Sequence, residues 1–180
     1  MRTLAATVSV AAASLALLAA GLHAGQAGAD PGPESGPREV ITVRFAGEMA
    51  NLEAFGTFGS FLFQGNLLSP SGAVVGSLVH RGRCSTTTPP PCLVFEVEDI
   101  FRLPGGDIVS RGKQSAAPDP QAPGQFLVGV YPPESRIVST TGAFQGRGGH
   151  VRMSGRDDCT SCPTFAVLDD VWLIELDPPA

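Results

Sequence analysis

The sequence has 180 residues, 43% of them hydrophobic, and a formal net charge of −5 at pH 7. This length is typical of one domain and is enough to bury one hydrophobic core. Binding to phosphates requires a concentrated basic patch, and a mildly acidic chain with scattered arginines offers none. Nucleic acids and other polyanions are therefore not expected as partners.

Residues 1–29 have the pattern of a signal peptide. Arg2 precedes an apolar run over residues 4–22, and residues 27–29 (AGA) form the small-x-small pattern after which signal peptidase cuts. A transmembrane anchor is the alternative, because the run has about the minimum length to span a bilayer. Its richness in alanine and the adjacent cleavage pattern favour removal, and the absence of an Arg-Arg pair indicates the general secretory route. We therefore expect a secreted, extracellular protein that starts at Asp30 and keeps no stable membrane anchor.

Residues 30–38 are rich in Pro and Gly and predict a flexible tether, and residues 39–177 predict one β-domain. From residue 39 onward the apolar residues come in short pieces of strand length, separated by turn residues, which is typical of an all-β barrel or sandwich. The pieces cover residues 40–46, 57–68, 73–81, 93–103, 107–113, 125–130, 150–155 and 164–176. No stretch after residue 30 has the 3.6-residue period of a helix.

Several pieces are apolar on both faces, such as Phe61-Leu62-Phe63 and residues 171–174. An antiparallel strand of this kind must be covered on both sides. In a barrel, a filled or ligand-bearing interior covers one side, and a neighbouring subunit could cover the other. We therefore predict a single antiparallel β-barrel and a homo-oligomer, with a two-sheet sandwich as the alternative.

Four cysteines follow the predicted signal peptide, and an even number in an exported chain indicates disulfides, with three possible connectivities. We favour the local pairs Cys84–Cys92 and Cys159–Cys162. A redox or zinc role for Cys159-x-x-Cys162 is the alternative. A redox pair should open a helix, whereas Pro163 and a strand-like run follow here. A zinc site would need two more ligands at a matching spacing.

The segment from Ile137 to Val151 (IVSTTGAFQGRGGHV) is similar to the Gly-Gly-Thr-Gly-x-Phe-x-x-Ala-x-Gly signature of allene oxide cyclases and dirigent proteins. Gly142 suits a turn with positive φ, and Gly149 suits a close backbone crossing. Other segments resemble these families in the same order along the chain: Phe58–Phe63, Leu67-Leu68 with Val75-Gly76-Ser77, and Leu93-Val94-Phe95 through Gly106–Gly112. Together they cover about residues 55–176.

The resemblance implies an eight-stranded antiparallel barrel, commonly a trimer, whose cavity binds an apolar small molecule. Allene oxide cyclases close an oxylipin ring in this cavity, and dirigent proteins steer the coupling of phenoxy radicals. Dirigent proteins have an Asp pair where this chain has Gly65-Asn66. The cyclases have at the position of Asn66 an asparagine that helps to hold a water. An amide does not ionise near neutral pH, so Asn66 could bind a ligand but not act as an acid.

Five polar residues share a strand face with apolar neighbours and are the candidates for ligand binding inside the barrel. They are Arg44, Asn66, Glu96, Arg111 and Tyr131. The structural alternative is that each points outward, because charged side chains are seldom buried unpaired. A Glu96–Arg111 pair inside an apolar barrel would be costly without a use.

No catalytic residue is assigned, and no metal or cofactor is expected. His80 is expected to face solvent, and a zinc site from His80, His150 and a carboxylate lacks support from ligand number. Two functions remain. The first is a secreted barrel that binds a hydrophobic small molecule, as a carrier or as a scaffold for cyclisation or coupling. The second is a structural or interaction module at the cell surface, with a solidly packed interior.

Overall fold

The computed structural model describes residues 37–49, 60–85, 93–131, 133–160 and 166–179. The predicted signal peptide and most of the predicted tether lie outside these residues.

The described part of the chain is all-β, as the short apolar pieces predicted. Its nine strands are β1 (Glu39–Met49), β2 (Ser60–Leu68), β3 (Val74–Cys84), β4 (Val94–Leu103), β5 (Gly106–Pro118), β6 (Gln125–Val130), β7 (Arg136–Thr140), β8 (Gly149–Asp158) and β9 (Ala166–Leu176). A single 3-10 turn, η1 (Gly142–Phe144), separates β7 from β8. Among the described residues no helix is long and apolar enough to cross a membrane.

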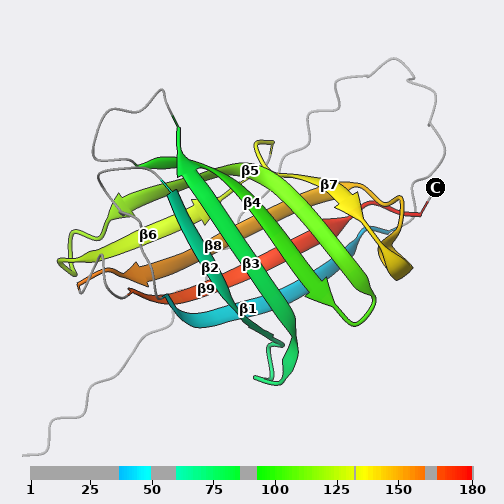
Figure 1. The fold of residues 1–180 in the computed structure, drawn as a ribbon, viewed down its shortest axis with the longest axis horizontal. Helices are drawn as coiled ribbons and strands as arrows, with labels where there is room; N and C mark the ends of the chain where they lie inside the picture. Colours follow the sequence, from blue (N-terminus) through cyan, green and yellow to red (C-terminus); the bar gives the residue numbers. More distant parts are fainter. Residues whose placement is uncertain (1–36, 50–59, 86–92, 132, 161–165, 180) are drawn as a thin grey trace, which may run out of the picture. The chain divides into compact units, whose positions relative to one another are not determined.

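The strands form one antiparallel sheet that closes in a ring (Figure 1). The hydrogen-bonded order is β4-β3-β2-β1-β9-β8-β6-β5-β7, and a further pairing of β4 with β5 closes it. β1 and β9 pair along their whole lengths, from Glu39 opposite Leu176 to Met49 opposite Ala166. The first and last strands of the sheet are therefore neighbours.

The sequence predicted eight strands, and β7 is the ninth. The long strand β5 pairs with β7 along Ile108–Arg111 and with β6 along Gln114–Pro118, so two short strands share one of its edges. β7 was overlooked because its five residues lie between a Pro-rich turn and the glycines of the following segment, which together resemble a loop.

Along the strands, every second side chain is buried in the interior of the ring. Its largest fully buried side chains include Trp172, Phe45, Phe63, Phe95 and Phe101. The ring centroids of Phe61 on β2 and Phe95 on β4 are 5.3 Å apart, so these strands contribute to one core rather than to separate layers. In the doubly apolar pieces the other parity faces outward, with Leu62 47% and Val171 43% exposed. A covering subunit on this outer face stays a prediction.

The two glycines singled out in the 137–151 segment have the predicted geometry. Gly142 has a φ of 60°, in the left-handed region. Gly149 has a φ of 139°, and a Cβ there would lie 1.9 Å from the carbonyl oxygen of Glu175 on β9. Gly149 therefore allows β8 to start directly against β9.

We expect Gly149→Ala to lower the free energy of unfolding by about 3 kcal/mol, because backbone strain and overpacking of the β8–β9 contact add together. Gly146→Ala is the matched control. Gly146 also has positive φ, 79°, but a Cβ there meets nothing within 4 Å. Its cost should be about 1 kcal/mol, from conformation alone. Urea unfolding of both variants measures the difference, and equal costs would show that the close contact is unimportant.

Candidate functional site: a buried polar cluster

Four polar side chains from three strands form a network inside the ring. His80 on β3 places Nδ1 2.5 Å from Asp99 Oδ1 on β4 and Nε2 2.7 Å from Gln114 Oε1 on β5. Ser110, also on β5, donates its hydroxyl to the other Asp99 oxygen at 2.7 Å. All four side chains are at most 2% exposed. The network is thus held entirely by protein groups.

Both ring nitrogens of His80 face an oxygen. Asp99 lies at Nδ1 and also accepts from Ser110, and the carbonyl oxygen of Gln114 lies at Nε2. Two N–H donors on the ring would therefore both find an acceptor here. A buried pair with its hydrogen bonds satisfied is the arrangement that limits the desolvation cost.

Aromatic rings enclose His80. The ring of Phe63 stacks on it with centroids 5.4 Å apart, that of Phe61 lies at 4.9 Å, and Trp172 on β9 meets it edge-on at 5.4 Å. Trp172 also contacts Phe101 edge-on at 5.3 Å. Aromatic side chains from β2 and β9 therefore enclose the His80 ring.

A second group of polar atoms in the interior lacks partners. Both carboxylate oxygens of Asp157, Oδ1 of Asp170 and the indole Nε1 of Trp172 are buried without a hydrogen bond to any part of the chain that the structure describes. Asp170 stands opposite Gly155 on β8, and its Oδ1 lies 1.8 Å from the place that a Cβ of Gly155 would occupy. The glycine therefore makes the space in which the Asp170 carboxyl group lies.

Burial raises the pKa of both carboxyl groups. The pKa of Asp157 is well above its usual value because of desolvation and then of repulsion from Asp170. Desolvation raises the pKa of Asp170 to about 7; the charge of His80 opposes this rise, and Asp169 and Asp99 add to it. The two groups interact, so they titrate as a pair. Together with the indole, they can donate or accept hydrogen bonds and carry a variable charge.

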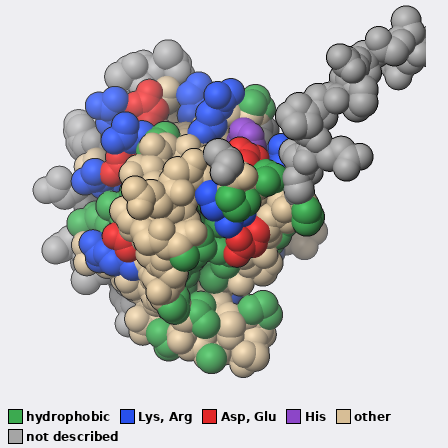
Figure 2. Space-filling view, turned by 90° about the vertical axis from the view of Figure 1, so that its right-hand side faces the viewer, with side chains coloured by type: hydrophobic (Ala, Val, Ile, Leu, Met, Phe, Trp, Pro, Cys, Tyr) green, Lys and Arg blue, Asp and Glu red, His purple; other side chains and the backbone are tan. Residues whose placement is uncertain are grey.

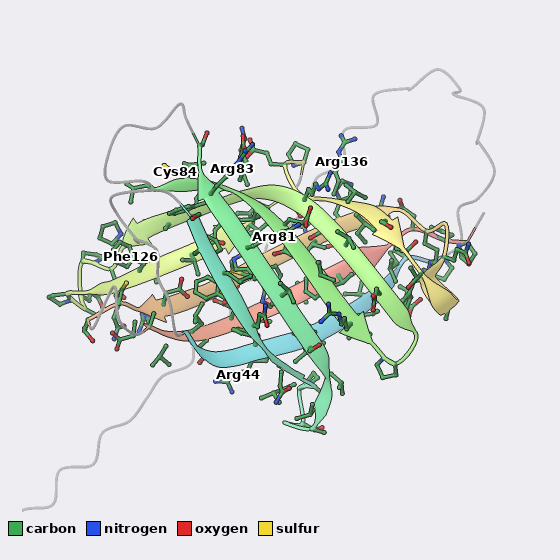
Figure 3. All side chains as sticks on the ribbon, viewed as in Figure 1. Arg44, Arg81, Arg83, Cys84, Phe126 and Arg136 are labelled. Carbon is green, nitrogen blue, oxygen red and sulfur yellow. The ribbon has the colours of Figure 1, made fainter. Side chains whose placement is uncertain are left out.

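The five candidates from the sequence are not in this interior. Arg44, Asn66, Glu96, Arg111 and Tyr131 are all exposed, and the prediction that their side chains line the interior is wrong. Arg44 binds Asp169 through two hydrogen bonds of 2.7 Å on the outside of β1 and β9 (Figure 3). Tyr131 is 56% exposed and packs over Gly129. A role for any of them in ligand binding stays a prediction.

The structure brings two of the five, Glu96 and Arg111, to one outer groove of about 670 Å³ on β2, β3, β4 and β5. They do not pair with each other: Glu96 binds Arg83, while Arg111 and Arg81 both bind Glu98. On the face shown in Figure 2, basic side chains likewise lie next to acidic ones. These exposed pairs have the character of a solvated cross-strand charge ladder.

His80 is buried rather than solvent-facing, so the expectation for it is wrong. His150 lies apart from it, with Nδ1 2.9 Å from the carbonyl oxygen of Ser135. Within the described ranges, no three His, Cys, Asp or Glu side chains are grouped so that they could hold a metal ion.

Cys84 ends β3 and Cys159 directly follows β8. Their predicted partners, Cys92 and Cys162, lie outside the described residues, so the pairing stays a prediction.

The sequence contained a signal for the buried cluster. Asp99 alternates with Phe95, Val97 and Phe101, and Asp170 occurs at the same period of two among Ala166, Leu168, Trp172, Ile174 and Leu176. An acid on the apolar face of a strand indicates a buried carboxyl group.

No protein-family model, curated protein or solved structure matches this chain.

Proposed function

We propose that this chain binds a small, largely apolar molecule in the interior of the ring, next to Asp157, Asp170 and Trp172. One observation carries the proposal: four buried polar atoms of these residues have no partner in the described chain. Buried polar groups in native proteins almost always have a hydrogen-bond partner, so unpartnered ones indicate that something else fills that role. A few convergent polar groups among aromatic and aliphatic walls are the usual composition of a small-molecule site.

The proposal extends to the class of fold. Eight strands make the continuous ring, β1-β2-β3-β4-β5-β6-β8-β9, while β7 lies beside β5. This is the strand number of the barrel shared by allene oxide cyclases and dirigent proteins, and we place the chain with that architecture. The geometry at Gly142 and Gly149 supports the assignment. Export by the general secretory route and assembly into a homo-oligomer belong to the same proposal and rest on the sequence alone.

Native mass spectrometry of the purified full chain tests the binding proposal. We expect a mass excess that persists under gentle ionisation and is released as a small molecule on denaturation. Asp170→Asn should reduce the occupied fraction, because it changes the charge and the donor pattern of the site. Asp169→Asn is the matched control, because the neighbouring Asp169 side chain is 54% exposed and binds Arg44 on the outside. Equal occupancy in the two variants would overturn the proposed place of binding.

The close packing of the interior favours a second candidate, a structural or interaction module. Trp172, Phe45, Phe63, Phe95 and Phe101 are all less than 2% exposed, so much of the interior is filled by side chains. This function predicts the bare protein mass in the same experiment. It also predicts no change in melting temperature when apolar small molecules are added, whereas a ligand that binds only the folded state raises it.

A further inference from the structure

We propose that the ligand group that meets Asp157 and Asp170 is a cation, so that the interior site takes apolar amines. This inference rests on the proposed function and specifies its class of ligand. It depends on the charges, the unpartnered atoms and the aromatic walls of the interior.

The interior has an excess of acidic groups. Asp99, Asp157 and Asp170 are buried there, whereas the other buried carboxyl group of the described residues, Asp119, has Arg156 as its ion-pair partner. His80 is the one basic side chain among the buried residues that the structure describes. His80 already uses both ring nitrogens, on Asp99 and Gln114. Asp157 and Asp170 are therefore left without a cation of their own, and a ligand can supply one.

The unpartnered atoms are suited to an ammonium group. Three carboxylate oxygens of Asp157 and Asp170 lack donors within the described chain, and an alkylammonium has three N–H donors. Trp172 provides a separate indication of an occupant, because its indole N–H is also buried and unpartnered. That N–H needs an acceptor, so an oxygen in the ligand or a water held with it would complete the site.

Aromatic residues at the neighbouring positions of the sheet favour a cation further. Phe45 on β1 stands directly opposite Asp170 in the sheet register, and Trp172 follows Asp170 by two residues on the same buried face of β9. Aromatic faces attract cations most strongly where water is excluded. Most of the other buried side chains are aliphatic or aromatic, so the rest of the ligand is expected to be apolar.

The charged groups around Asp170 set the pH dependence. His80 from β3 favours its ionised form, whereas Asp99 from β4, Asp157 from β8 and the adjacent Asp169 oppose it. A bound ammonium favours the ionised form of both buried carboxyl groups, so binding should release protons at slightly acidic pH. Alkylamines stay protonated throughout the range from pH 5.5 to 8.

Isothermal titration calorimetry of the full chain with octylamine, octanol and octanoate tests the inference. The carboxyl group of Asp170 is about 3% ionised at pH 5.5 if it titrates near 7, so octylamine affinity should rise about 30-fold between pH 5.5 and pH 8. Titrations in buffers of different ionisation enthalpy should show proton release near pH 6. Asp170→Asn should weaken octylamine at pH 8 at least tenfold and flatten the pH profile. Asp169→Asn removes one smaller repulsion on Asp170, so it should keep the affinity at pH 8 within about twofold of the parent and shift the pH profile slightly to lower pH.

Tighter binding of octanol or octanoate than of octylamine would overturn the cationic ligand while leaving the proposed function supported. An octylamine affinity that is the same in Asp170→Asn and the parent would also overturn it. Binding of none of the three probes would count against the proposed function itself. Thermal unfolding of each variant establishes that it is folded.

Discussion

Asp170→Asn is expected to increase the free energy of unfolding at pH 8 by about 4 kcal/mol while changing it by less than about 1 kcal/mol at pH 4. The pKa of Asp170 is raised to about 7 in the folded protein, and an unfolded Asp titrates near 3.9. Between these values the folded state keeps a proton that the unfolded state has lost. Stability is therefore present below the unfolded pKa and is lost as the pH rises toward 7.

Urea unfolding of the parent and the variant at steps from pH 4 to pH 8 measures this effect. The parent should lose stability across the interval, and Asp170→Asn should lose less, because the amide does not ionise. Asp169→Asn is the control with the opposite sign. The hydrogen bond from Arg44 lowers the pKa of Asp169, so its removal should cost a little stability at neutral pH. Parallel profiles for the parent and Asp170→Asn would show that the buried carboxyl group is not the titrating one.

Asp99→Asn is expected to lower the free energy of unfolding by about 3–5 kcal/mol, the cost typical of removing one partner from a buried ion pair. The change keeps the shape of the side chain but removes the carboxylate that faces Nδ1 of His80. It also replaces an acceptor of the Ser110 hydroxyl with a group that can present its NH₂ instead.

The neighbouring residue supplies the control. Glu98 faces outward on the same strand and binds Arg81 and Arg111, so Glu98→Gln removes an ion pair near solvent. Its cost should be under about 1 kcal/mol. Replacing His80 by Phe and Asp99 by Leu together should cost less than Asp99→Asn alone, because no charge then remains unpaired. If Asp99→Asn costs no more than Glu98→Gln, the contact of the Asp99 carboxylate with His80 does not stabilise the fold.

The class of fold could be predicted because strand length, turn chemistry and lack of a helical period are local properties. The piece 93–103 corresponds closely to β4, and the piece 107–113 covers the first part of β5, which continues to Pro118. The turn between the two strands is Pro104-Gly105, and the third predicted turn residue, Gly106, starts β5. β7 was not predicted because its pairing depends on the far longer β5. No local pattern shows that one strand will have two partners on the same edge.

The orientation of the strands was the main error in the candidate site. On β1, the parity of Arg44 with Val40 and Thr42 looked apolar enough to face inward, yet Ile41, Val43 and Phe45 are the inner set. Both parities of this strand carry apolar residues, so a shift by one residue exchanges the two faces without an obvious penalty in the sequence. The alternate positions that carry the bulkier apolar residues were the better guide to the inner face of a strand. The same rule applied to β4 and β9 would have led to Asp99 and Asp170. Which buried oxygens lack partners depends on side chains from several strands and could not be predicted from any one of them.

The pairing of β1 with β9 has a consequence for how the chain folds. The first and last strands of the chain meet at this seam, and Arg38 and Asp177 form an ion pair of 3.5 Å just outside the two strands. During synthesis β2 can pair with one edge of β1 early. The other edge of β1 stays unpaired until β9, the last strand, has been made. Contacts so distant in the chain slow folding and leave an open strand edge exposed meanwhile. Aggregation should therefore threaten the nascent chain far more than the finished ring, whose seam conceals that edge.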